Sequence, residues 1–562
     1  MTHSTGLPVL PQTALERFAA ALRAVILEQF PDVPEPAITF EAPRRAEFGD
    51  FATNAAFALA RAAKRPPQDL AGQLLAAALA ADPDLQGLFS GAAAAAGFIN
   101  LRLAAPVWQG AVAQIVREGP PPRRAAREKT RISLEFGSAN PTGPLVVVQG
   151  RTCSIGAALT NAMLFCGYDV FVEWIINDAG GQMETLARSL YARYRQIFQP
   201  DFPFPEEGYP GDYLPPVAQR IVQADGPKWI DAPQEQWMPY FAKFGRDTLV
   251  AEQLQTVARF GIGYDLWQSE QEMHQSGRIS AGIERLKAGG HTYERDGALY
   301  FKATSFGDDK DRVLVRSDGR PTYFSNDVAY HYEKLQRADK VVDILGPDHH
   351  GYIGRLKGLA EALGYSRDHL EVLIAQQITL MRGGEQVSMS KRAGHIVTLD
   401  DIIDEVGVDA ARFFFIMPAP ESPLTFDLEL AKEQSNDNPV FYVQYSHARI
   451  CSVFRNARRT DVELARSGEY TAALDAPAEI ALARRLAEMP QVVENVVTQL
   501  APHRLTRYAR DVASDFHQFY HESRVLVEDR DQRLSRLALC IAAQTVLAAV
   551  LSMIGVSAPE SM

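Results

Sequence analysis

The pattern of residues 131–178 limits the folds available to this chain more than any other stretch. Apolar residues alternate over 132–136, as in a half-buried strand, and residues 137–150 are rich in Gly, Pro, Ser, Thr and Asn, as in a loop. Apolar residues then recur at helical spacing over 155–166, and a β-branched apolar run follows at 170–176. This order predicts a βαβ unit with parallel strands and a right-handed crossover.

The loop at 137–150 is the first candidate site. It joins the carboxyl end of a strand to the start of a helix, where free backbone N–H groups and the helix dipole converge. Nucleotide phosphates bind at such positions in doubly wound sheets. The sequence therefore predicts a nucleotide site in this loop.

The composition is that of a large globular protein. With 562 residues the chain is too long for one domain, and its 46% hydrophobic and 22% charged residues are ordinary values. Four cysteines without a CxxC pair argue against a zinc site or a disulfide framework and favour the reducing cytoplasm. No apolar run reaches the roughly 18 residues of a membrane span, and the N-terminus lacks a signal-peptide pattern. A net charge of −12 argues only weakly against RNA, because local basic faces bind RNA on acidic proteins.

Three domains are expected. Residues 1–118 combine amphipathic helices with an alternating strand, and the proline-rich linker at 119–124 excludes helix after them. Residues 128–425 alternate strand and helix, which predicts a Rossmann-type, doubly wound parallel sheet. Residues 426–562 carry helical periodicity, as in an all-α bundle.

An insertion divides the central domain. Residues at about 191–304 interrupt the alternation with aromatic-rich loops and helices, and the sheet pattern resumes in apolar runs at 312–316, 341–345 and 370–374. The expected fold is multidomain α/β: an α+β N-terminal domain, the doubly wound sheet domain with its insertion, and the all-α C-terminal bundle.

Polar residues gather at three other places where chemistry is expected. Tyr323 and Asp327 are four residues apart and would share a helix face, and a carboxylate beside a phenol suits a guanidinium or ammonium group. Lys391 lies in a glycine-punctuated segment, 381–394, from which a cation is able to close over a triphosphate. His349 lies in a loop after an apolar strand, and no further His or Cys completes a metal set. Taken singly, a capping Asp with a core Tyr, and a solvated surface turn, are simpler interpretations of the first two.

Together these segments resemble the arginyl-tRNA synthetases, class I aminoacyl-tRNA synthetases of bacterial type. The resemblance covers essentially the whole chain, and the motifs follow the family's order: SANPTGPL at 138–145, which leads into the family's His-x-Gly-His signature, INDAG at 176–180, YPGDY at 209–213, DHHG at 348–351, MSK at 389–391 and DIIDEVGVDAARFFF at 401–415. At the two ends, GDFATN at 49–54 resembles the family's added domain, which touches the tRNA elbow, and YVQYSHARI at 442–450 resembles its anticodon-binding domain.

The resemblance implies a ligase that joins arginine to tRNA(Arg) through arginyl-adenylate. ATP would be used as its Mg²⁺ complex, with no tightly bound metal. Residues 1–118 would form the added tRNA-binding domain and residues 426–562 the anticodon-binding domain. The family further implies a cytoplasmic monomer that acts in protein biosynthesis away from membranes.

The resemblance also assigns roles to individual residues. Glu135 and Asn140 align with residues that hold the arginine ammonium group, whereas Tyr323, Asp327 and His349 align with the guanidinium pocket. A bidentate carboxylate reads a planar guanidinium best, so Asp327 is the expected specificity residue. Catalytic roles fall to Lys391 and Gln149, and ATP contacts fall to Ser138, Val146, Val148, Gln149, Met389, Ser390 and Lys391.

The signature departs from the family pattern at its centre. Where the family has His-Val-Gly-His, this chain has Val-Val-Val-Gln at 146–149. The side chain of Val146 cannot donate a hydrogen bond, Gln149 cannot be cationic, and Val148 puts a β-branched side chain where glycine lets adenine approach. Loss of one preorganised donor typically costs about 10²–10³ in rate. ATP binding and chemistry are both affected by these changes.

Two interpretations stay open. The chain is either a synthetase whose altered loop still works, or an impaired synthetase-like paralogue that binds arginine or tRNA for a role other than aminoacylation. A small-molecule nucleotidyltransferase on the same fold is disfavoured, because it would not need the terminal domains.

A tRNA ligand requires positive surface. Arg504, Arg507 and Arg510 recur at helical spacing and form the candidate tRNA-binding stripe. A solvated helix face is the alternative.

Overall fold

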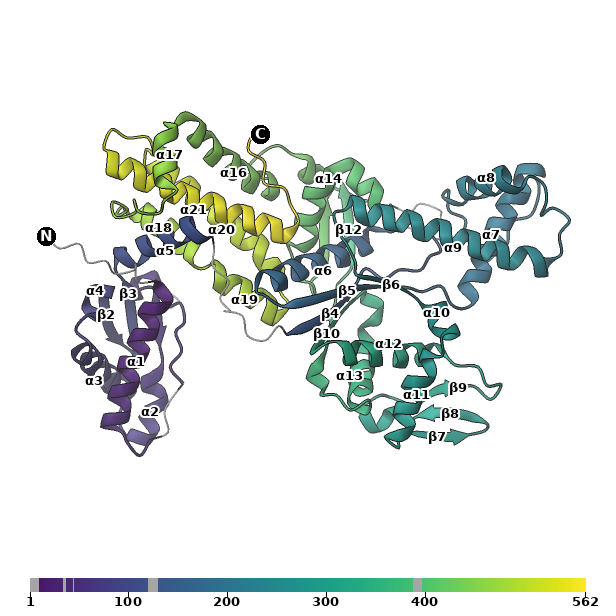
Figure 1. The fold of residues 1–562 in the computed structure, drawn as a ribbon, viewed down its shortest axis with the longest axis horizontal. Helices are drawn as coiled ribbons and strands as arrows, with labels where there is room; N and C mark the ends of the chain where they lie inside the picture. Colours follow the sequence, from purple (N-terminus) through teal and green to yellow (C-terminus); the bar gives the residue numbers. More distant parts are fainter. Residues whose placement is uncertain (1–9, 34–36, 44, 120–129, 388–396) are drawn as a thin grey trace.

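A computed structural model describes residues 10–33, 37–43, 45–119, 130–387 and 397–562, and Figure 1 shows their arrangement. A parallel sheet lies at the centre of the molecule. The helical bundle and the N-terminal region lie on one side of it, and the inserted helices project from the other.

The N-terminal region is a small α+β unit. Its antiparallel sheet has the order β1-β3-β2, and helix α1 packs against α3 in front of it. The bounds are α1 Pro11–Gln29, β1 Phe51–Thr53, α2 Ala55–Ala63, α3 Pro67–Ala81, α4 Leu85–Leu88, β2 Phe89–Ala95 and β3 Phe98–Leu103. The next helix, α5 (Ala105–Glu118), packs instead against α18 (Pro477–Ala487) and α21 (Arg530–Ile554) of the bundle. Residues 105–118 therefore connect the two ends of the chain.

The central sheet is parallel throughout and has the order β11-β10-β4-β5-β6. This confirms the doubly wound sheet. Its strands are β4 Arg131–Phe136, β5 Asp169–Ile176, β6 Leu266–Ser269, β10 Lys340–Leu345 and β11 Leu370–Ile374. Strand β6, inside the segment expected as an insertion, adds the edge next to β5, and no sequence pattern predicted it.

The prediction that residues 312–316 continue this sheet is wrong. They form β9 (Arg312–Val315), which pairs with β8 (Ala298–Phe301) in a separate antiparallel sheet with β7 (Thr292–Arg295). A short connection makes β8 the nearest partner, so local antiparallel pairing forms there.

Helices cover both faces of the parallel sheet (Figure 1). On one face α6 (Val147–Phe165) packs against α14 (Leu399–Ile416) and α21. On the other face lie α12 (Tyr323–Arg337), which contacts β4 and β10, and α13 (Ile353–Ala362), which contacts β11. Helices α10 (Glu270–Gln275) and α11 (Arg278–Ala288) join β6 to this second layer. The carboxyl ends of the parallel strands lie between these two layers of helices.

Three helices form the projecting insertion. They are α7 (Gly181–Phe198), α8 (Leu214–Asp225) and α9 (Gln234–Arg259), and they have a hydrophobic core of their own. The ring of Tyr191 stacks on Trp237 with centroids 3.9 Å apart. The insertion is thus a packed unit and not an extended loop.

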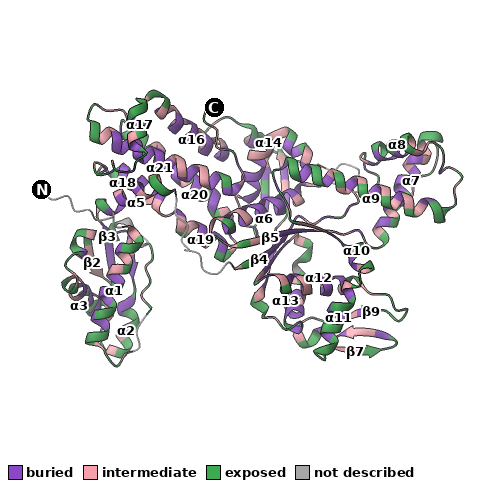
Figure 2. Ribbon diagram, in the orientation of Figure 1, coloured by how far each residue is buried: buried purple, intermediate pink, exposed green. Residues whose placement is uncertain are grey.

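The C-terminal region is a helical bundle, as the sequence predicts. Its helices are α16 Pro439–Asn456, α17 Arg459–Ala465, α18, α19 Met489–Gln499, α20 His503–Glu522 and α21. Between sheet domain and bundle lie β12 Ile378–Arg382, β13 Glu385–Gln386, β14 Leu424–Asp427 and α15 Leu428–Lys432. Among the described residues α21 has the length and hydropathy to cross a membrane, yet 72% of its apolar window is buried (Figure 2), as in a core helix.

Candidate active site

The strand order reverses between β4 and β10. From β4 the chain crosses through α6 to β5 on one side, and from β10 it crosses through α13 to β11 on the other. The two strands are parallel neighbours, with Glu135 and Asp343 as register partners. Such a switch point opens a crevice at the carboxyl ends of the strands, which is where ligands bind in doubly wound sheets.

The loop after β4 is held in place by neighbouring elements. Ser138 Oγ donates to Glu135 Oε1 at 2.7 Å and accepts from the Ile175 N–H at 3.0 Å. The exposed Asn140 accepts at Oδ1 from Asn177 Nδ2 at 3.3 Å, and its carbonyl oxygen accepts from Gln253 Nε2 at 3.0 Å. The predicted ligands Glu135, Ser138 and Asn140 are thus brought to one edge of the sheet.

Helix α6 begins earlier than the sequence pattern indicated. The expected loop to residue 150 ends at Val146, and Val147 is the first helical residue. Gln149 Oε1 accepts the Val146 N–H at 3.2 Å, so Gln149 caps its own helix. The usual signal for a helix start is Ser, Thr, Asp or Asn at the N-cap, and this helix has Val146 there. Its cap is instead the side-chain amide of Gln149, at the third helical position, so sequence reasoning missed this turn.

The altered signature therefore lies on the first turn of a buried helix. Val146, Val148 and Gln149 are partly exposed there, whereas Val147 is 1% exposed. The first N–H groups of the helix remain available to an anion, and the Gln149 amide nitrogen is the side-chain donor of this turn.

Tyr323 and Asp327 occupy one face of α12, as the sequence predicts. Helix α12 begins at Tyr323, and the side chain of Tyr323 is 58% exposed. Its hydroxyl lies over Gly180, where an added Cβ would stand 1.8 Å from the oxygen. Gly180, with φ +90°, therefore makes room for the Tyr323 ring.

The carboxyl of Asp327 has an unusual environment. Its pKa is raised to about 6: burial and the charge of Glu135 raise it, whereas the charges of His331, Arg355 and Lys334 lower it. Among the described residues no donor is recorded on the Asp327 carboxylate. An unpaired, partly buried carboxyl is prepared for a cationic ligand.

A second carboxylate, Glu270, lies close to Asp327, and sequence reasoning missed it. Burial raises the pKa of Glu270, the hydrogen bond from Asn326 opposes that shift, and the negative charge of Asp327 adds to it. Asn326 Nδ2 donates to Glu270 Oε1. The available signal was an acidic residue directly after a strand, but that strand, β6, was not predicted.

His349 lies on a short 3₁₀ helix, Pro347–Tyr352, and its side chain is exposed. Its ring centroid is 5.4 Å from that of Tyr352, and the guanidinium of Arg355 lies 4.4 Å from the Tyr352 ring. Within the described residues its recorded ring contact is with Tyr352 and not with Tyr323 or Asp327. The described contacts therefore do not bring His349 to Tyr323 or Asp327.

Met389, Ser390 and Lys391 lie outside the described residues. Downstream, Thr398 forms a β-bridge with Val146, and the Leu399 N–H donates to the Leu145 carbonyl at 2.8 Å. The chain after residue 397 therefore returns directly to the start of α6.

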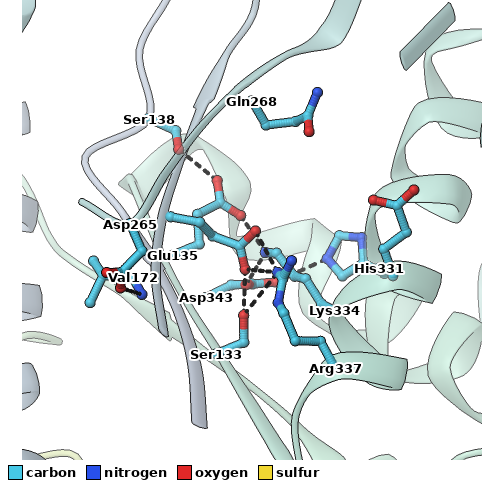
Figure 3. A network of polar contacts seen from close by, with 12 residues as sticks. Ser133, Glu135, Ser138, Val172, Asp265, Gln268, His331, Lys334, Arg337 and Asp343 are labelled. Carbon is cyan, nitrogen blue, oxygen red and sulfur yellow. Dashed lines mark hydrogen bonds and ion pairs between the residues drawn. The ribbon is translucent and has the colours of Figure 1, made fainter. Parts of the chain in front are cut away.

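A network of buried charges surrounds Glu135 (Figure 3). Lys334 Nζ lies 2.5 Å from Glu135 Oε2 and 2.6 Å from Asp343 Oδ1, and His331 Nε2 lies 2.9 Å from Asp343 Oδ2. The side chain of Lys334 is fully buried. No group of three His, Cys, Asp or Glu among the described residues is placed to hold a metal ion.

Arg504, Arg507 and Arg510 are all exposed on α20, as their helical spacing predicts. Arg504 Nη2 donates to Gln499 Oε1 at 2.6 Å. The three guanidinium groups lie on the outer face of the bundle.

The fold and the site are those of a class I aminoacyl-tRNA synthetase. Three family models match the chain: "Arginyl tRNA synthetase N terminal domain" over residues 12–103, "tRNA synthetases class I (R), catalytic domain" over 239–415 and "DALR anticodon binding domain" over 443–562. The arginine–tRNA ligase of Syntrophotalea carbinolica is 43% identical over 531 residues, which cover 94% of this chain and 95% of that protein. The chain belongs to the arginyl-tRNA synthetase family.

Two further comparisons agree. The arginine–tRNA ligase of Heliobacterium modesticaldum is 43% identical over 539 residues, which cover 94% of each chain. The arginyl-tRNA synthetase structure from Thermus thermophilus matches the fold with a TM-score of 0.74 at 22% identity, over 98% of this chain and 100% of that one.

Proposed function

We propose that this protein attaches L-arginine to tRNA(Arg), with ATP as its Mg²⁺ complex and arginyl-adenylate as the intermediate. The observation that carries the proposal is the acidic cluster near the switch point, where Glu135 and Glu270 each lie within electrostatic reach of Asp327. Arginine is a ligand with two cationic ends. Carboxylates at both ends of a crevice match it in charge and in number.

The guanidinium end binds between α12 and the β6 edge. Asp327 and Glu270 accept its N–H groups, Tyr323 lies beside them over Gly180, and His349 closes the pocket from the 3₁₀ helix. The planar guanidinium group has five N–H donors. When it is desolvated, more than one carboxylate is needed to accept its hydrogen bonds. Lysine, a compact charge on a flexible stem, would leave part of this acceptor set unpaired.

The ammonium end binds at the carboxyl end of β4. Glu135 accepts from it, and Asn140 lies on the same loop with its carbonyl and side chain already anchored. The arginine carboxylate then points toward the start of α6, where its oxygen attacks the α-phosphorus of ATP and pyrophosphate leaves.

ATP binds at the first turn of α6. Ser138, Val146, Val148 and Gln149 line its place, and Met389, Ser390 and Lys391 come from the segment that re-enters at Thr398 beside Val146. Gln149 donates its amide N–H to phosphate, and Lys391 neutralises charge as pyrophosphate departs. A terminal ribose hydroxyl of tRNA next attacks the arginyl carbonyl, and AMP leaves.

A second function is favoured by one observation. Val146, Val148 and Gln149 replace the family's signature residues, and the Gln149 side-chain oxygen is occupied by the Val146 N–H. A protein that keeps the arginine pocket but activates arginine poorly would bind arginine or tRNA for a role other than aminoacylation.

One assay separates the two functions. Full-length protein is incubated with labelled arginine, ATP, Mg²⁺ and tRNA(Arg), and charged tRNA is counted, while filter binding measures tRNA affinity. Charging at rates ordinary for such ligases establishes aminoacylation. No charging, with arginine or tRNA still bound, establishes the second function, and binding of neither ligand contradicts both.

The setting of this function is also a proposal. We propose that the protein acts in the cytoplasm, as a monomer, with tRNA(Arg) as its macromolecular partner. Light scattering of the purified protein, alone and with tRNA(Arg), tests the monomer and its one-to-one complex.

A further inference from the structure

Lys334 forms the centre of a buried, charge-balanced network beneath the pocket. Its ammonium lies between Glu135 Oε2 at 2.5 Å and Asp343 Oδ1 at 2.6 Å, and 4.0 Å from the centroid of the Tyr330 ring. Glu135 and Asp343 are neighbours across β4 and β10, so without this cation two buried carboxylates would face each other. Lys334 is fully buried, so bulk water does not screen the pair.

His331 supplies the second cation of the network. Its Nδ1 lies 2.7 Å from the carbonyl oxygen of Asp327 and its Nε2 lies 2.9 Å from Asp343 Oδ2. Both partners only accept hydrogen bonds, so both ring nitrogens carry protons and the ring is an imidazolium. Burial opposes this charge, but the hydrogen bond and the charge of Asp343 outweigh burial and raise the pKa of His331.

The network is balanced without outside help. Two carboxylates, Glu135 and Asp343, face two cations, Lys334 and His331. The nearby buried Glu173 has its own partner, since Arg337 Nη2 lies 2.8 Å from each of its oxygens (Figure 3). Lys334 is therefore committed to the pair that borders the pocket.

The network connects the two ends of the arginine site. At one end Lys334 and Ser138 hold the two oxygens of Glu135, which fixes the carboxylate plane. At the other end His331 holds the backbone of Asp327. We propose that Lys334, with Asp343 and His331, is a positioning residue that holds the Glu135 carboxylate in place and aimed at the ligand's α-ammonium group. This rests on the proposed function, because it presupposes that arginine occupies the pocket.

A positioning role for Lys334 predicts how strongly the protein discriminates between ligands with and without an α-ammonium group. The ligand 5-guanidinopentanoate has the same guanidinium and carboxylate as arginine but no amine. The ratio of the two dissociation constants therefore reports the free energy of the α-ammonium contact. A charge-assisted hydrogen bond of this kind corresponds to a preference of about 10- to 100-fold. Loss of Lys334 should reduce that preference, whereas general loosening of the fold would weaken both ligands alike.

The variant must avoid leaving a lone buried charge. Lys334→Met alone leaves Glu135 and Asp343 opposed, and its misfolding would be uninformative. Lys334→Met combined with Asp343→Asn removes one cation and one anion, so the net charge of the network is unchanged. Lys357→Met is the matched control, because Lys357 pairs with Glu371 on α13 and β11 at 2.8 Å, away from the pocket.

The test is calorimetric titration of the full-length proteins with arginine and with 5-guanidinopentanoate, beside their thermal unfolding. We expect the wild type and Lys357→Met to prefer arginine by the same factor, and the double variant to lose about tenfold or more of that preference while it still unfolds cooperatively. A double variant that binds both ligands with the wild-type ratio overturns the role of Lys334 and leaves the proposed function standing. A wild type that binds neither ligand overturns both.

Discussion

The hydroxyl of Tyr323 lies directly over Gly180, so close that a single added methyl group at position 180 would occupy its place. This contact joins the loop after β5 to the start of α12, which are separated by more than a hundred residues in the chain. Glycine is required at position 180 for two reasons. Its φ of +90° is a conformation that other residues rarely adopt, and a side chain there would collide with Tyr323.

Gly180→Ala should displace the Tyr323 ring, because the contacted atom is the free end of a side chain. We expect the arginine Kd to rise about tenfold, with about 1 kcal/mol of stability lost to the positive φ. Titration with arginine and urea unfolding measure the two effects. Gly181→Ala is the control, since an added Cβ there meets nothing within 4 Å. An unchanged arginine Kd in Gly180→Ala would remove Tyr323 from the pocket.

Arginine affinity should depend on pH through Asp327. Burial raises the pKa of this carboxyl to about 6, and only its ionised form pairs with a guanidinium. We expect affinity to be constant above pH 7 and to fall by up to tenfold per pH unit below about 6. Titration between pH 5 and 8 measures the profile. Asp327→Asn should bind weakly at every pH, and a persistent inflection near 6 in that variant would assign the titration elsewhere.

The same pKa has the opposite consequence for the ligand-free protein. A carboxyl whose folded pKa lies above its unfolded value favours folding only when protonated, so ionised Asp327 destabilises the fold above pH 6. Asp327→Asn should therefore stabilise the free protein at pH 7.5 by about 1 kcal/mol, and the gain should disappear as the pH falls toward 4. Thermal unfolding at the two pH values tests this, and a destabilised variant at pH 7.5 would contradict it.

We expect the first turn of α6 to limit the rate of arginine activation. Val146→His, Val148→Gly and Gln149→His together should raise charging by about 10²–10³, because two phosphate donors are restored at a helix N-terminus and the backbone is opened to adenine. Single-turnover charging of tRNA measures the gain. Gln149→Ala, which removes both the cap on the Val146 N–H and the amide donor proposed for phosphate, should not gain activity. A triple variant no faster than the wild type would place the limiting defect outside this turn.

The exposed arginines of α20 are testable as an RNA contact. Arg507→Ala should weaken tRNA binding and lower the slope of log affinity against log salt by about one, as expected when one phosphate contact is lost. Arg459→Ala on α17 is the control, because Arg459 is equally exposed and pairs with Glu463 at 2.8 Å. Filter binding from low to high salt gives both slopes. Equal slopes for the two variants would exclude Arg507.

Local patterns in the sequence predicted much of this structure correctly. The alternation at 132–136 became β4, and the spacing of Tyr323 and Asp327 placed both on one face of α12. The exposed stripe on α20 followed from helical spacing in the same way. These features depend on neighbours within one or two turns of chain, which a single sequence displays.

Other features escaped that reasoning. Strand β6 is four residues long and is stabilised by pairing with β5, and Glu270 is informative only once β6 is known to end beside α12. The run at 312–316 was a strand, as expected, but its partner was the hairpin and not the parallel sheet. Short apolar runs specify an extended conformation without specifying a partner.

The family and the parallel sheet follow from the sequence alone, because motifs and periodicity are local properties. How the buried charges are balanced depends on the tertiary structure. Lys334 is an unremarkable lysine on a helix until β4 and β10 bring Glu135 and Asp343 into register on either side of it. Electrostatic pairing depends on distance in space and on burial, and neither is encoded in the spacing of residues along the chain.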